Sequence, residues 1–337
     1  MGNFKSNLTI IGVVVIVFLS GLVLWYSPPD FLKPEPVKVQ YQVATGGANE
    51  LRAQVIKKYG LDKKHGVELE IISTDPGELE RRISKGESYL AEVSPFTALA
   101  AKQNNVELRI ISPAVYFNYY LLVSSNSKIT SLEELKGGKI GTQPKVTAAY
   151  SALAIVLKSA GFDIEKDFSV LFGNIPQTVA AVEKGEADAA SASYPSAAAI
   201  IAGGKFRSIA SLGDLWSKNE DGLSLPFVVL AANGDWFEEN RETARRVVET
   251  ILEGGRFIQE QPQVLSELTD YLNKYNYNTP QITALLEAHI PSMLPASYGE
   301  KEVRAFERFF ARAKQLKIIP PDAPIESYLV KPTDLGI

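Results

Sequence analysis

The pattern of hydrophobic and polar positions begins with one unbroken apolar run near the N-terminus. Leu8 to Tyr26, LTIIGVVVIVFLSGLVLWY, contains 19 residues and no charge. At about 1.5 Å of rise per residue, a helix of this length matches the roughly 30 Å hydrocarbon core of a bilayer. Trp25 stands where an interfacial aromatic belt would lie, and Lys5 before the run favours a cytoplasmic N-terminus. The pattern predicts a single transmembrane helix.

A cleaved signal peptide is the alternative for this segment. The apolar region of a signal peptide is usually shorter and ends in a cleavage site of the A-x-A type. No such site follows the run, and a chain without cysteine has no lipoprotein acylation site. Ser27 to Pro36, SPPDFLKPEP, is rich in proline and predicts a stiff spacer. We therefore expect residues 1–36 to form an uncleaved anchor and linker, with secretion after cleavage as the alternative.

Beyond the linker, the pattern alternates between short strands and helices. Val37 to Val43, VKVQYQV, alternates apolar and polar residues and predicts a strand. A helical stretch to Tyr59 follows, and Gly60 ends it. The same order recurs, with strands predicted at 67–72, 139–141 and 169–172 and helices at 75–84, 146–160 and 176–183. This alternation is typical of an α/β fold, and helices predominate after residue 235.

Two segments of the chain resemble each other at a fixed distance. ISKGESYLAEVSPFTALAA from Ile83 aligns with VEKGEADAASASYPSAAAI from Val182, so that Ser94 and Ser193 are 99 positions apart. Chance recurrence of K-G-E before a strand is the alternative. Two similar α/β units are the preferred interpretation. Because ligands bind beyond the carboxyl ends of strands in open α/β sheets, two such units would present their loops to one shared crevice.

Composition excludes several classes of function. The chain has 337 residues, a net charge of −4, no cysteine and two histidines. The charge offers no basic field for nucleic acid, and the lack of cysteine excludes disulfides, thiolate metal sites and a cysteine nucleophile. His65 and His289 fit a turn and a helix better than catalysis, and no GxSxG, HExxH or Walker motif occurs. We expect no catalytic residue, metal site or cofactor, and no nucleic-acid partner.

Four passages carry a more specific signal in combination. They begin at Tyr59 (YGLDKKHGVELE), Ile83 (ISKGESYLA), Ile129 (ITSLEELKGGKIG) and Ala181 (AVEKGEADAA). Together they resemble the solute-binding proteins of ABC importers for nitrate, sulfonates, taurine and thiamine-pyrimidine-like compounds. The resemblance spans 37 to about 258.

The sequence departs from the pattern of this family at two of these passages. Tyr89 and Glu134 occupy positions where the family usually has aspartate. Many family members are lipoproteins or fully secreted, so a transmembrane anchor would be a variation.

The resemblance implies an α/β fold of the type II periplasmic-binding-protein class, with two crossovers between two lobes. We expect residues 37–115 with 222–337 to form lobe I and residues 116–221 to form lobe II. The implied function is extracytoplasmic binding of a small molecule by a monomer that delivers it to an ABC-transporter permease. An enzyme on the same fold, resembling pyrimidine-precursor or menaquinone-pathway proteins, is the alternative, as is a ligand-sensing module. Those enzymes work in the cytosol, which the predicted anchor argues against.

Small and polar residues follow the predicted strands at the expected crevice. Thr45, Gly46, Gly47 and Ala48 end a strand and open a helix, where free backbone N–H groups favour anionic or polar ligand groups. The same reasoning applies to the second unit, at Thr142, Gln143 and Thr147. A plain strand-to-helix turn is the alternative for both loops.

Three further positions complete the candidate binding site. Ser94 with Pro95, and Ser193 with Tyr194, follow matching strands and offer hydroxyls and a ring, although a helix-capping serine is the alternative. Asn118 and Tyr119 lie at the first expected crossover, where strand core is the alternative. The candidate ligand-binding residues are therefore Thr45, Gly46, Gly47, Ala48, Ser94, Pro95, Asn118, Tyr119, Thr142, Gln143, Thr147, Ser193 and Tyr194.

The charges near these loops indicate the kind of ligand. Lys145 is the one charged residue within the loops, and Arg52 lies one turn into the first helix. A multiply charged anion would require more compensation than this. Nearby aromatic residues suit an apolar or planar surface. We expect a small organic molecule with one anionic or strongly polar end.

Overall fold

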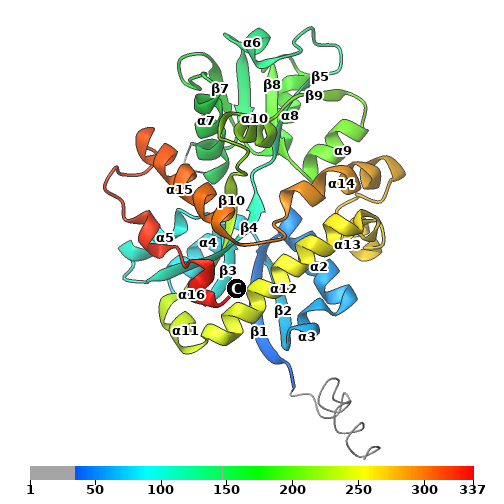
Figure 1. The fold of residues 1–337 in the computed structure, drawn as a ribbon. Coiled ribbons are helices and arrows are strands. Elements are labelled where there is room, and N and C mark those ends of the chain that lie inside the picture. Colours follow the sequence, from blue (N-terminus) through cyan, green and yellow to red (C-terminus); the bar gives the residue numbers. More distant parts are fainter. Residues whose placement is uncertain (1–34, 146) are drawn as a thin grey trace, which may run out of the picture. The chain divides into compact units, whose positions relative to one another are not determined.

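Two five-stranded sheets organise the chain, of which the computed structural model describes residues 35–145 and 147–337. Residues Lys38–Ile337 form one compact unit that contains both sheets (Figure 1). The first sheet has the strand order β2 (Val67–Thr74), β1 (Val37–Ala44), β3 (Leu90–Val93), β10 (Pro226–Asn233) and β4 (Leu108–Tyr116). The second has the order β7 (Ser169–Phe172), β6 (Lys139–Thr142), β8 (Ala189–Ser193), β5 (Tyr119–Ser124) and β9 (Phe206–Ser211).

The two sheets have the same internal plan. In each, a central strand pairs in parallel with the strand that begins the unit, β1 with β3 and β6 with β8. On its other side the central strand pairs antiparallel with a strand that arrives from the opposite sheet, β10 or β5. The aligned repeat therefore corresponds to β3 and β8 with their flanking helices, which confirms the prediction of two similar α/β units.

The helices lie close to where the hydrophobic pattern places them. Asp75 accepts hydrogen bonds from the backbone N–H groups of Gly77 and Glu78, and Gly60 ends a helix in the left-handed conformation, with φ 64°. The helices of the first half are α2 (Ala48–Tyr59), α3 (Leu61–Lys64), α4 (Pro76–Ser84), α5 (Thr97–Gln103), α6 (Leu132–Leu135), α7 (Ala148–Ser159) and α8 (Ile175–Glu183). Those of the second half are α9 (Ser196–Ala202), α10 (Leu212–Asn219), α11 (Gly234–Glu239), α12 (Arg241–Glu260), η2 (Pro262–Leu265), α13 (Thr269–Lys274), α14 (Pro280–Met293), α15 (Glu300–Gln315), η3 (Ile325–Tyr328) and α16 (Pro332–Leu335).

The chain passes between the sheets twice. Phe117 and Asn118 separate the end of β4 from the start of β5. The return path runs from α10 to β10 through Glu220, which is fully buried and accepts hydrogen bonds from Arg308 and Arg312 of α15, each at 2.8 Å. Gly222 follows with a φ of 74°. The return crossover is thus fastened to a C-terminal helix by a buried carboxylate.

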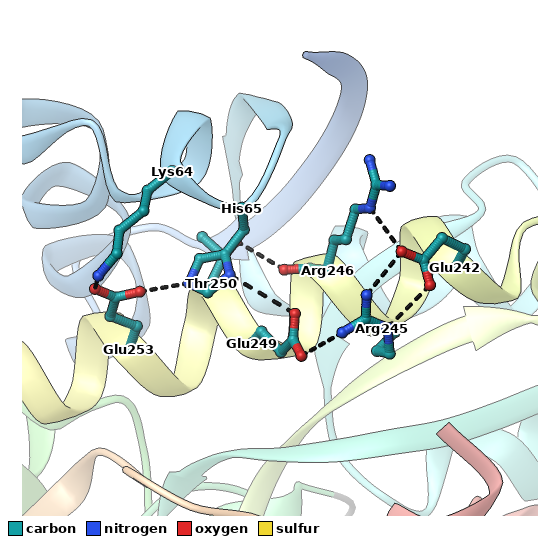
Figure 2. Close-up of polar contacts among 8 residues, drawn as sticks. All are labelled: Lys64, His65, Glu242, Arg245, Arg246, Glu249, Thr250 and Glu253. Atoms are coloured by element: carbon teal, nitrogen blue, oxygen red, sulfur yellow. Dashed lines mark hydrogen bonds and ion pairs between the residues drawn. The ribbon is translucent and has the colours of Figure 1, made fainter. Parts of the chain in front are cut away.

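Helix α12 packs closely on the first sheet's helices because two glycines face its neighbours. A Cβ at Gly254 would lie 2.7 Å from the Ile56 side chain of α2, and one at Gly255 would overlap the Pro295 carbonyl oxygen. The other side of α12 is polar and forms ion pairs. There, Glu253 binds Lys64, the last residue of α3, and His65, which follows it, as Figure 2 shows.

The same view shows further ion pairs along α12. Glu242 accepts hydrogen bonds from Arg245 and Arg246, and these lower the pKa of its carboxyl to about 2. His65 therefore belongs to a surface network of charges on the first sheet's helices.

The predicted transmembrane segment, Leu8 to Tyr26, lies outside the described residues. Within residues 35–145 and 147–337, no helix is both long enough and apolar enough to cross a membrane.

Candidate ligand-binding cleft

A cavity of about 510 Å³ draws its walls from both sheets. This volume falls in the range of about 300 to 1,000 Å³ that is usual for small-molecule sites. The first sheet contributes the loop after β1, the end of β3 and residues of β4 and β10. The second sheet contributes the loop after β6, the N-terminus of α7 and the end of β8. The carboxyl ends of the parallel strands thus meet at one site, as the topology rule requires.

The loop after β1 is held in place by a buried carboxylate. Glu50 is 1% exposed and accepts hydrogen bonds from the Gly46 backbone N–H at 2.6 Å and from the Tyr275 hydroxyl at 2.8 Å. Lys274 of α13 lies 3.2 Å from the same carboxylate. Burial alone would raise the pKa of Glu50, but these bonds bring it below its ordinary value. The Gly46 amide is therefore already occupied by a protein group.

Aromatic side chains form much of the apolar wall. Tyr119 stacks on Phe117 with ring centroids 4.8 Å apart, and Phe227 of β10 meets the edge of Tyr119 at 5.7 Å. Tyr119, Phe227 and Tyr194 all line the cavity. Burial raises the pKa of the Tyr119 and Tyr194 hydroxyls, which therefore remain neutral at physiological pH. Their rings suit an organic ligand with apolar surface.

Behind Tyr194, a second aromatic group joins the second sheet to α14. The His289 ring lies 4.6 Å from Tyr194, centroid to centroid, and its Nδ1 is 3.0 Å from the Tyr120 hydroxyl. Burial lowers the pKa of His289, so its ring is neutral near pH 7. This histidine does not line the cavity, but it packs against Tyr194, which does.

Asn118 at the first crossover is also bound internally. Its Nδ2 donates to the Tyr120 hydroxyl at 3.1 Å, and its Oδ1 accepts from the Ser211 hydroxyl at 3.2 Å. The residue lines the cavity with its position fixed from both sides.

Most of the residues proposed from the sequence line this cavity. They are Thr45, Gly46, Gly47, Ala48, Ser94, Asn118, Tyr119, Gln143, Thr147, Ser193 and Tyr194. Two do not. Thr142 is 1% exposed. Its hydroxyl points into the second sheet and accepts a hydrogen bond from the Ser191 hydroxyl at 2.8 Å. Pro95 is buried inside the turn in which the Phe96 backbone N–H donates to the Ser94 hydroxyl at 3.3 Å.

The two basic residues considered near the ligand lie elsewhere. Lys145 forms an ion pair with Glu165 and is 63% exposed. Arg52 is fully buried behind the cavity, where it donates to the Ala114 carbonyl oxygen at 2.6 Å and binds Glu92 and Tyr41. Neither side chain lines the cavity.

Sequence reasoning missed two acidic residues and several apolar ones. Glu80 of α4 and Glu92 of β3 line the cavity, as do Phe227, Val228 and Met293. Glu92 interrupts an otherwise apolar strand, LAEV, which is a detectable signal of a special role. Phe227, Val228 and Met293 come from segments whose place at the cleft depends on the return crossover, and no local pattern marks them.

Glu92 forms the floor of the site with a network of polar groups. One carboxylate oxygen, Oε1, accepts from the Tyr41 hydroxyl and from Arg52. Burial raises the pKa of Glu92, whereas Arg52, Tyr41 and the nearby Asn49 amide oppose that rise. Glu92 Oε2 and Asn49 Nδ2 have no hydrogen-bond partner among the described residues.

The fold and the cleft define a class of two-sheet binding proteins that enclose small solutes. A family model described as "ABC transporter, phosphonate, periplasmic substrate-binding protein" matches residues 52–250. The chain belongs to this family. It is a substrate-binding component of an ABC importer and binds its solute on the extracytoplasmic side. A search of curated proteins finds no significant match.

Solved structures agree with this fold. The periplasmic aliphatic sulphonate binding protein SsuA from Escherichia coli is 17% identical, with a TM-score of 0.68, over 89% of this chain and 93% of that one. The periplasmic nitrate-binding protein NrtA from Synechocystis PCC 6803 is 15% identical, with a TM-score of 0.69, over 90% and 88%. The desulfurization enzyme DSZB is 14% identical, with a TM-score of 0.60, over 89% and 98%. At these identities the likeness establishes the fold alone.

Proposed function

We propose that the chain captures a small organic solute in the cleft between the two sheets and passes it, chemically unchanged, to its permease. The observation that carries this proposal is the cavity of about 510 Å³, whose lining includes residues of both sheets and several aromatic rings. A site divided in this way binds most tightly when its two halves close on the ligand. The closed form would be the state that the permease recognises.

Two lobes would move as rigid bodies in this mechanism. We assign residues 37–115 with 222–337 to lobe I and residues 116–221 to lobe II. The short connections at Phe117 and Asn118, and from Glu220 to Gly222, support this assignment because the chain passes between the sheets there. They would act as the hinge. A monomer suffices, because one chain supplies both walls of the cavity.

A purely binding role, rather than catalysis, is supported by the residues of the cavity. Neither histidine of the chain lines it, so the hydroxyls of Ser94 and Ser193 have no imidazole base within it. There is no cysteine to serve as a nucleophile. The fold shared with DSZB keeps an enzyme as the alternative.

Binding and recovery of the ligand test this proposal. The full-length protein in a non-ionic detergent would be screened by thermal shift against a panel of small organic amines, alcohols, carboxylates, sulfonates and phosphonates. We expect a stabilising compound to be recovered unchanged after prolonged incubation. Phe227→Ala should weaken its binding at least about tenfold, since the ring forms part of the wall. Phe172→Ala is the matched control, because Phe172 is 49% exposed and lies outside the cavity.

Two results would contradict the proposal. The first is conversion of the bound compound to a product, which would favour the enzyme. The second is equal binding by the Phe227→Ala and wild-type proteins, which would place the ligand elsewhere.

We further propose that Leu8 to Tyr26 remains attached and anchors the protein in the membrane. Its support is the uncharged 19-residue run followed by a proline-rich spacer. N-terminal sequencing of the protein from membranes should begin at or near residue 1. A mature chain that begins after residue 20 would establish cleavage instead.

A further inference from the structure

The cavity wall has an unusual charge for a site expected to hold an anion. Its charged side chains, Glu80 and Glu92, are both carboxylates, and no lysine, arginine or histidine is among the described residues of the lining. Arg52 balances Glu92 from behind, within the core. Glu80 has no basic residue within ion-pair distance among the described residues, whereas Glu78 and Glu87 nearby both pair with Arg81.

Two buried polar atoms at the wall lack partners. Glu92 is 1% exposed, and its Oε2 has no hydrogen-bond partner in the part of the chain that the structure describes, although Oε1 has two. Asn49 is 3% exposed, and its amide lies near enough to the Glu92 carboxyl to lower the pKa of that carboxyl. Its Nδ2 nevertheless has no partner at hydrogen-bond geometry among the described residues. Buried polar atoms in native proteins are nearly always hydrogen-bonded. An acceptor and a donor left open in the lining therefore indicate ligand groups that complete them.

The backbone donors that would attract an anion are partly occupied. The Gly46 N–H donates to Glu50, at 2.6 Å, before α2. At the start of α7, the Thr147 hydroxyl accepts from the Tyr150 N–H, at 3.3 Å. Protein groups therefore take hydrogen-bond donors at both helix N-termini on which the expectation of an anionic end rested.

We propose that the solute is an organic cation, a small amine with an apolar body and a nearby hydrogen-bond acceptor. This inference rests on the proposed function and specifies its ligand. The ammonium group donates to the free oxygen of Glu92 and is balanced by the Glu80 carboxylate. The acceptor receives the Asn49 amide, and the apolar body lies against Tyr119, Tyr194 and Phe227. Aromatic faces also attract a cation directly.

A matched series of probes distinguishes this ligand class from the alternatives. Aryl-alkyl compounds with one shared carbon skeleton and a terminal amine, alcohol, carboxylate, sulfonate or phosphonate would be titrated calorimetrically into the full-length protein in non-ionic detergent. The small molecules that co-purify with the protein would be identified by mass spectrometry in parallel. We expect amines to bind at least about tenfold more tightly than their anionic counterparts, and the co-purified molecule to contain an amine.

Glu80→Gln is the variant that tests the site itself. Among the described residues Glu80 has no ion-pair partner that the change would leave uncompensated, so this variant should fold. Glu92→Gln would instead leave Arg52 uncompensated in the core. We expect amine affinity to fall at least about tenfold in Glu80→Gln. Glu78→Gln on the same helix, outside the cavity, should bind as the wild type does.

The outcomes separate this inference from the function on which it rests. Tighter binding of sulfonates, phosphonates, carboxylates or alcohols than of amines, or amine binding unchanged by Glu80→Gln, would overturn the inference and leave solute capture intact. If no probe binds and no small molecule co-purifies, both would fail.

Discussion

Glu92 has a structural role in addition to the binding role proposed for it. It is fully buried beside Arg52, so its removal leaves a guanidinium without its counter-charge in the core. We predict that Glu92→Gln lowers the free energy of unfolding by about 3 kcal/mol or more. Urea denaturation measures this change. The double variant Arg52→Gln with Glu92→Gln should lose less than the sum of the single changes, and strict additivity would contradict the coupling.

Glu80 predicts a pH dependence of the unliganded protein. Burial raises the pKa of its carboxyl above the ordinary value of 4.5, so the folded state binds the proton more tightly than the unfolded chain does. The stability that Glu80 contributes is therefore complete below pH 4.5 and is lost as pH rises through the raised pKa. Glu80→Gln lacks this loss. The melting temperature of Glu80→Gln relative to wild type should thus increase between pH 4.5 and pH 7, and a constant difference would contradict the account.

The sequence predicted residues of the candidate cleft where local structure places them there. Thr45 to Ala48 and Thr147 lie at the cleft because they follow strands and open helices, which the hydrophobic pattern shows. The ligand's expected charge depended partly on Lys145 and Arg52, whose side chains turn to Glu165 and into the core. Spacing along the chain gives no information on such side-chain directions. Phe227 and Met293 were missed because tertiary packing alone brings them to the cavity.

At the scale of elements, α12 illustrates how glycine permits close packing. Gly255 lies inside the helix, where alanine would ordinarily be favoured by about 1 kcal/mol. Here the added Cβ would overlap the Pro295 carbonyl oxygen. We predict that Gly255→Ala destabilises the protein by about 1 to 3 kcal/mol, as measured by urea denaturation. Glu260→Ala, at an exposed position of the same helix, is the control. A gain in stability for Gly255→Ala would show that no overlap exists.

Helix and strand boundaries were largely predictable because local chemistry sets them. Asp75 caps α4, Gly60 ends α2, and Arg241 to Glu260 forms the amphipathic helix that its apolar spacing predicts. The short final elements, η3 and α16, were not predicted. They contain only four residues each, too few to show a periodic pattern.

At the scale of the whole molecule, the internal repeat was the strongest guide to the fold. Ser94 and Ser193 occupy equivalent places in two sheets of equal strand order, at or just after the ends of β3 and β8. The exchange of β5 and β10 between the sheets could not be predicted from periodicity. The residues of each strand indicate a strand, but they do not indicate which sheet it joins. That exchange makes the cleft, since it places Phe227 and Tyr119 against each other.

The most direct test of solute capture is native mass spectrometry of the full-length protein from its producing cells. We predict one small molecule bound per chain, released unchanged on unfolding. Val228→Trp, which adds volume at the cavity wall, should be folded by circular dichroism and lack that mass. A wild-type protein that never carries a ligand, or a Val228→Trp variant that carries the same ligand at the same occupancy, would contradict the account.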